Sequence, residues 1–244
     1  MTRVFDKPLL LALAATTFAA CSSDNDIVTQ PPPPPPPPAM ATLEVTVTNL
    51  TNAQPLSPVG VIAHMDGYAV FAVGTAATAG LEELAEGGDT AALLAEADAD
   101  TSVIATASGA APIGPAGSET ISLEVLESDL ASLRISTSTM LVNTNDAITM
   151  LDAMDVSNLE VGNSLSTRTI AYDAGTEANT ELAAHIPGPA GGGEGFNAAR
   201  DDSFDRVAMH TGVVGSTDGF LSSDLDGQHR FDNPVAEVRI ERIN

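Results

Sequence analysis

Apolar and polar residues alternate at both ends of the region that we expect to fold. From Leu43 to Thr48 every second residue is apolar, and the residues between them are Glu or Thr. The same period of two returns from Ala236 to Glu241, where Ala, Val and Ile alternate with Glu and Arg. Alternation of this kind is typical of a strand with one face on the core and one in water. The pattern predicts a half-buried strand at each end.

Further short apolar or β-branched runs predict strands between these two. They are Val59–His64, Ala69–Val73, Ser102–Ala107, Glu119–Leu126, Leu130–Val142, Ile148–Val156 and Ser164–Tyr172. Turn segments rich in Gly, Pro, Asn and Asp separate the runs. Many short strands with such turns and few helices indicate an all-β protein, and we expect an antiparallel β-sandwich.

Two segments have helical spacing instead. Residues Gly80–Gly88 and Ala91–Ala97 are predicted to form short helices in the loops, and the glycines at 87 and 88 end the first. We interpret the glutamates of these helices as a solvated face. A long stretch, Ala183–Asp232, is rich in Gly, Asp and Ser and has no periodicity. It is predicted to form loops held down by the scaffold, or to be partly disordered.

Residues 1–21 are predicted to be a lipoprotein signal peptide. Arg3 and Lys7 precede an apolar run, Leu9–Ala20, which ends at the chain's single cysteine, Cys21. A basic start, a short apolar stretch and small residues before the cut describe an export signal. Ala19-Ala20-Cys21 is similar to the bacterial lipobox. We expect a lipid on Cys21 and a place in the bacterial cell envelope, as an outer-membrane lipoprotein or at the cell surface; an unmodified thiol is the alternative.

Residues 22–40 read as a disordered, Pro-rich linker. Small polar residues lead into an unbroken proline run from Pro31 to Pro38. Such a run adopts polyproline II at about 3.1 Å per residue, so it is roughly 25 Å long. We expect it to hold a folded domain, residues 41–244, away from the membrane. A proline motif bound by a recognition domain is the alternative.

The charge balance excludes one class of partner. The formal net charge is −24, and Lys7 is the only lysine. Nucleic-acid binding requires a basic face, so it is not expected. The acidity favours solubility, suits a saline habitat, and raises the local concentration of divalent cations.

Three carboxylates stand out by their position at predicted strand ends. Asp146 follows one strand, and Asp173 and Glu177 follow another, separated by Ala-Gly-Thr. If the two turns meet, the three side chains offer the hard oxygen ligands that a cation such as Ca²⁺ prefers. The alternative is that these are ordinary turn residues, because Asp and Asn bond to their own backbone in turns.

Several ordered motifs of the chain are similar to the spondin domain, the N-terminal domain of F-spondin and mindin. The similarity spans about Thr42 to Arg242. It rests on Val45–Thr51, Gln54–Pro58, His64, Gly80–Asp89, Met140–Asp146, Tyr172–Glu177, His210–Gly212 and Pro234–Val238.

The resemblance implies a C2-like β-sandwich with one Ca²⁺ at its loop end. The family's ligands fall on Asp146 and Asp173, and on Glu177, where the animal proteins carry Asp. The cysteines of the animal domains are missing. Because a bacterial surface is expected, the integrin and matrix partners of the animal proteins are not carried over.

These observations together lead to an expected function. We expect a non-enzymatic, calcium-binding surface lipoprotein, anchored to the membrane by its lipid, that binds an extracellular protein or glycan in adhesion. One alternative is an envelope-assembly protein with a purely stabilising metal. Another is a metal-assisted hydrolase, which needs a general base beside the metal; only His64 or Glu181 could serve.

Overall fold

The alternating segments at the two ends of the domain are neighbouring strands of one sheet. A computed structural model describes residues 34–202 and 204–244. Its first sheet is antiparallel and has the order β4-β1-β10-β7. These strands are β1 (Met40–Asn49), β4 (Ser118–Leu126), β7 (Ser164–Thr169) and β10 (Ala236–Arg242). Val45 of β1 lies opposite Ile240 of β10, which sets the register.

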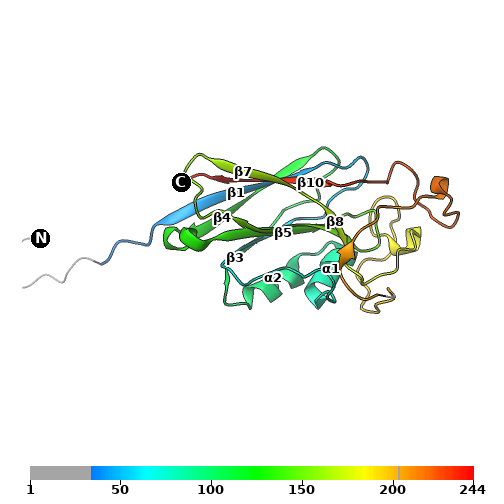
Figure 1. Cartoon of the computed structure of the whole chain (residues 1–244), viewed down its shortest axis with the longest axis horizontal. Helices are drawn as coiled ribbons and strands as arrows, with labels where there is room; N and C mark the ends of the chain where they lie inside the picture. The colour runs from blue at the N-terminus through cyan, green and yellow to red at the C-terminus, as the bar shows by residue number, and fades with distance from the viewer. Residues whose placement is uncertain (1–33, 203) are drawn as a thin grey trace, which may run out of the picture. The chain divides into compact units, whose positions relative to one another are not determined.

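The second sheet is also antiparallel and stacks under the first (Figure 1). Its order is β3-β2-β5-β6-β8-β9. The strands are β2 (Gly60–His64), β3 (Val103–Ser108), β5 (Arg134–Met140), β6 (Ala147–Asp155), β8 (Ala171–Asp173) and β9 (Ala208–Met209). The inward residues of both sheets, among them Leu43, Val45, Ile135 and Val238, form the main core. The prediction of an all-β sandwich is confirmed.

Two helices cover the outer face of the second sheet. These are α1 (Ala79–Gly87) and α2 (Ala91–Asp98), close to the predicted bounds. Their leucines pack with Ile62 of β2 and Ile148 of β6 in a second core. Because β5 is covered on both faces, its run of Ser and Thr from Ser136 to Thr139 is buried.

Three element predictions differ from the structure. Ala69–Val73 contains no strand. A 3₁₀ helix, η1 (Glu127–Ser132), occupies the start of the strand predicted from Leu130. The strand predicted from Ser164 is broken at Ile170, so β7 belongs to the first sheet and β8 to the second. The alternation of residues in the sequence does not reveal such a crossing, because side chains alternate with a period of two in either sheet.

The long segment 183–232 consists of loops fastened to the scaffold. It contains β9 and two short 3₁₀ helices, η2 (Ala183–His185) and η3 (Ser216–Asp218). Ile186, Val213 and Leu225 form a small third core beneath it.

The predicted signal peptide, Cys21 and most of the linker lie outside the described residues. No helix in the described part of the chain is long and apolar enough to cross a membrane.

Candidate metal centre

The end of the second sheet brings two of the predicted ligands together. β6 begins directly after Asp146, and β8 ends at Asp173. These strands pair so that Ala147 lies opposite Asp173. The N–H of Ala174 also donates to the Asp146 carbonyl, at 3.2 Å. Antiparallel pairing of β6 and β8 therefore places both aspartates at the same end of the second sheet. The sequence predicted that these two turns would meet.

Asp146 is completely buried, and only one of its two carboxylate oxygens accepts hydrogen bonds. Its Oδ2 accepts from the backbone N–H of Thr176 at 2.8 Å and of Glu177 at 3.2 Å. The Thr176 hydroxyl donates to the same oxygen at 3.3 Å. Oδ1 is buried without a partner among the described residues. Burial, and then the nearby charge of Asp173, raise the pKa of Asp146 to about 7.

Asp173 is held by the turn that follows it. Its Oδ1 accepts from the N–H of Gly175 at 2.9 Å, and its Oδ2 accepts from the Asn179 side chain at 2.6 Å. Gly175 has φ +72°, and a Cβ there would lie 2.3 Å from the Arg206 carbonyl oxygen. Only glycine fits this position, because both the backbone angle and the close approach exclude a side chain.

The third predicted ligand, Glu177, points its carboxyl group elsewhere. It lines a cavity of about 120 Å³, whose wall consists of Glu86, Glu177, His185, Glu194, Asn197, Ala199 and Asp201. One of its oxygens lies 3.9 Å from Nδ1 of His185. Burial, followed by the charges of Glu86, Asp146 and Asp201, raises the pKa of Glu177 to about 8.

The interpretation of the helix glutamates as a solvated face is wrong for two of them. Glu82 and Glu86 lie one helical turn apart on the buried side of α1. Glu82 forms an ion pair with Arg200 at 2.7 Å, and Glu86 accepts from the N–H of Asn197 at 2.9 Å. Their partners are more than 100 residues away. The spacing of four was the only sequence signal that they share a face.

The donor set fits a hard cation at Asp146 and Asp173. Asp146 supplies a buried oxygen without a partner, and Asp173 supplies a second carboxylate beside it. Within the described residues, however, no three His, Cys, Asp or Glu side chains converge closely enough to hold a metal ion between them. Glu177 thus contributes its N–H to Asp146, whereas its carboxyl group faces the neighbouring cavity.

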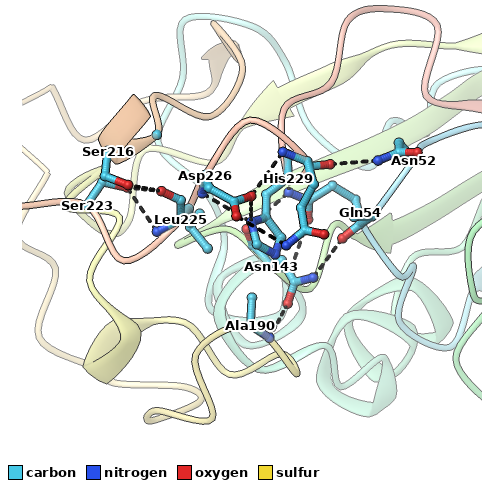
Figure 2. Close-up of polar contacts among 12 residues, drawn as sticks. Asn52, Gln54, Asn143, Ala190, Ser216, Ser223, Leu225, Asp226 and His229 are labelled. Carbon is cyan, nitrogen blue, oxygen red and sulfur yellow. Dashed lines mark hydrogen bonds and ion pairs between the residues drawn. The ribbon is translucent and has the colours of Figure 1, made fainter. Parts of the chain in front are cut away.

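A buried amide network holds the loops of 183–232 to the turn at Asn143, and Figure 2 shows its contacts. Nε2 of Gln54 donates to the Asn143 carbonyl at 3.1 Å and to the His229 carbonyl at 2.8 Å. The N–H of Asn143 donates back to Gln54 at 3.0 Å. The side chain of Asn143 bonds Ala53 and Ala190, at 2.8 and 2.9 Å. The turn before Asp146 therefore also anchors the loops.

Comparison with known proteins identifies the family of this chain. Residues 50–185 match the model of the spondin N-terminal domain, which is more than half of the chain. The chain belongs to this family. No curated protein matches it. The matched segment of this spondin domain contains Asp146, Asp173 and Glu177, whereas β9, β10 and the loops after residue 185 lie beyond it. Membership indicates a non-enzymatic domain of a kind that is typically extracellular.

Proposed function

We propose that this spondin domain is a calcium-binding, non-enzymatic adhesion or ligand-binding module, carried on the bacterial cell surface by a lipid on Cys21. The observation that carries the calcium proposal is Oδ1 of Asp146, a buried carboxylate oxygen without a partner beside Asp173. A cation is the natural partner of such an atom, and oxygen ligands favour Ca²⁺. Asp146 and Asp173 would hold it, and its charge would offset their mutual repulsion; Glu177 would become the third ligand on turning its carboxyl group away from the cavity that it lines.

The placement of the possible general bases favours a binding role over hydrolysis. His64 pairs with Arg134 at the end of β5 that lies away from Asp146. It is fully buried, with Nε2 2.9 Å from the Ser136 hydroxyl and Nδ1 2.8 Å from the Met65 carbonyl. Glu181 lines a different pocket, whose wall contains neither Asp146 nor Asp173, and its Oε1 accepts from the N–H of Val214.

The test of the calcium proposal is thermal unfolding of the full chain in excess Ca²⁺ and in chelator. Calcium that binds only the folded state stabilises it by about 2.7 kcal/mol at 100 times Kd. In a domain of this size that raises Tm by roughly 5–10 °C. Asp146→Asn removes the charge and keeps the shape, so we expect its Tm to be the same in both conditions.

The control is Asp152→Asn, which removes an exposed carboxylate from β6. It should keep the full response to calcium. A wild-type Tm that ignores Ca²⁺, or an Asp146→Asn variant that responds as the wild type does, would show that calcium does not bind here.

Adhesion is tested separately on cells. Removing surface proteins with protease, or deleting the gene, should reduce attachment, and readdition of the wild-type protein in Ca²⁺ should restore it. Normal attachment together with a calcium-dependent Tm would instead support the envelope-assembly role with a stabilising metal.

A further inference from the structure

A second pocket lies beside the candidate metal centre and is separate from it. Its volume is about 390 Å³. Two loop segments line it, Asn179–Glu181 and Thr211–Phe220. The second segment lies outside the part of the chain that matches the family model. The lining residues are Asn179, Glu181, Thr211, Gly212, Val214, Asp218, Gly219 and Phe220.

Glu181 is fixed in this pocket in an unusual conformation. Its φ is +56°, a left-handed value that residues with a side chain rarely adopt. Its N–H donates to Oδ1 of Asn145 at 3.2 Å, and its carbonyl accepts from the N–H of Asp224 at 2.9 Å. Only 3% of the residue is exposed. Strain held in place by its surroundings is a feature of binding sites.

One carboxylate oxygen of Glu181 has no hydrogen-bond partner among the described residues. Oε1 of Glu181 accepts from the N–H of Val214 at 3.3 Å, and no described residue donates to Oε2. Both oxygens of Asp218 are occupied, by Arg230 at 2.9 Å and by the N–H of Gly215 at 3.1 Å. Arg230 therefore forms an ion pair with Asp218. Burial raises the pKa of Glu181 to about 7, as expected for a carboxyl group without a counterion.

The rest of the wall is partly apolar. Phe220 lines the pocket and is half-buried, and Val214 is 44% exposed. Leu221 follows Phe220 and is 88% exposed. A ligand that fits this wall therefore carries methylene groups next to a group that the free oxygen of Glu181 can bind.

We propose that this pocket binds a lysine side chain of a partner protein, with its ammonium on Oε2 of Glu181 and its methylene stem along Phe220. A compact ammonium needs one free oxygen, whereas the planar arginine fork is best matched by two. The net charge of −24 steers a basic partner toward the chain. The chain has no lysine after Lys7, so its other copies do not compete. The proposal holds whether or not Asp146 binds calcium.

The test uses an acetylated and amidated Gly-Lys-Gly peptide as the probe. It is titrated into the labelled full chain while the NMR shifts of the Gly212 and Gly219 amides are followed. We expect saturable shifts with the lysine peptide, weaker binding of the arginine peptide, and no binding of the norleucine peptide. Glu181→Gln keeps the size of the side chain and an acceptor for Val214, and should weaken binding about ten-fold or more because a charged hydrogen bond is lost.

The matched control is Glu160→Gln, which removes an exposed carboxylate elsewhere and should bind as the wild type does. Phe220→Ala is the second variant, because it leaves the buried carboxylate intact; it should weaken binding even if Glu181→Gln fails to fold.

Three results would overturn the proposal. They are equal binding of the norleucine peptide, unchanged affinity in both the Glu181 and Phe220 variants, and tighter binding of glucosamine than of the lysine peptide, which would indicate a sugar site. The titration is repeated in Ca²⁺ and in chelator. Displacement of the peptide by Ca²⁺ in the Asp146→Asn variant would make the pocket a cation site instead.

Discussion

Burial is the main influence on the pKa values of three carboxyl groups at the loop end. Asp146, Glu177 and Glu181 each have a raised pKa, and desolvation is the largest cause for all three. A raised carboxyl pKa means that the folded state binds the proton more tightly than the unfolded state. The stabilisation is then complete below the unfolded pKa and is lost as pH rises through the folded pKa. For these groups the window runs from about pH 4 to about pH 8.

In chelator, we therefore expect Tm to fall as pH rises from about 5 to about 8. Each unit by which a folded pKa exceeds the unfolded one contributes about 1.4 kcal/mol to this loss. Glu181→Gln should flatten the dependence, because one of the titrating groups is removed. Thermal melts across this range are the measurement, and Glu124→Gln, at an exposed position of β4, is the control. A Tm that rises with pH in chelator would contradict the sign.

The sequence locates the aspartates of the site but not the direction of every side chain. Asp146 and Asp173 end predicted strands, and antiparallel pairing is enough to bring them together. The Glu177 carboxyl group instead faces a cavity that it lines together with Glu86 and Asp201. That cavity is assembled from segments far apart in the chain, and spacing within one segment carries no information about it.

At the scale of elements, the amide network of Gln54 and Asn143 joins the loops to the sandwich. Both side chains are buried and bond backbone groups: Gln54 bonds those of Asn143 and His229, and Asn143 bonds those of Ala53 and Ala190. A buried carbonyl or N–H that loses such a partner keeps its desolvation penalty. The network therefore determines how firmly the segment 183–232 is held.

We expect Asn143→Ala to lower the free energy of unfolding by about 1–3 kcal/mol. Two bonds are lost, to the Ala53 carbonyl and from the Ala190 N–H. Limited proteolysis should then cut within 183–232 before the strands. Asn158→Ala, at an exposed turn position where the side chain bonds only Ser157, should change neither result. Global loss of protease resistance, with no early cut in the loops, would argue against a local anchor.

Element types were well predicted where the period of two was unbroken, as in β1, β4 and β10. The misassignments have physical causes. The crossing at Ile170 preserves the alternation while the chain changes sheets. The irregular segment 69–73 has apolar residues because Val70 and Phe71 pack into the helix-side core, not because they extend a sheet. Apolar character alone does not separate these two uses.

At the scale of the whole molecule, the acidic surface opposes compaction. The formal net charge is −24, and like charges on one folded chain repel each other. Salt shortens the range of that repulsion, from about 30 Å at 0.01 M to about 3 Å at 1 M. The stability of the domain should therefore depend on ionic strength even without specific ion binding.

We expect Tm in chelator to rise by several degrees when NaCl is raised from about 0.02 M to about 0.5 M, because the repulsion is screened. The Asp146→Asn variant should show the same rise, which separates screening from occupation of the metal centre. An unchanged or falling Tm would mean that the surface ion pairs outweigh the repulsion.

The pairing of β1 with both β10 and β4 determines how the domain carries mechanical load. The first strand of the domain lies inside its sheet, held by seven aligned residue pairs on one side and nine on the other. It enters at the end of the sandwich that lies opposite the loops (Figure 1). Antiparallel hydrogen bonds are perpendicular to the strands. Under the proposed lipid anchor and loop-bound partner, tension between the two ends would shear both ladders at once instead of opening them bond by bond.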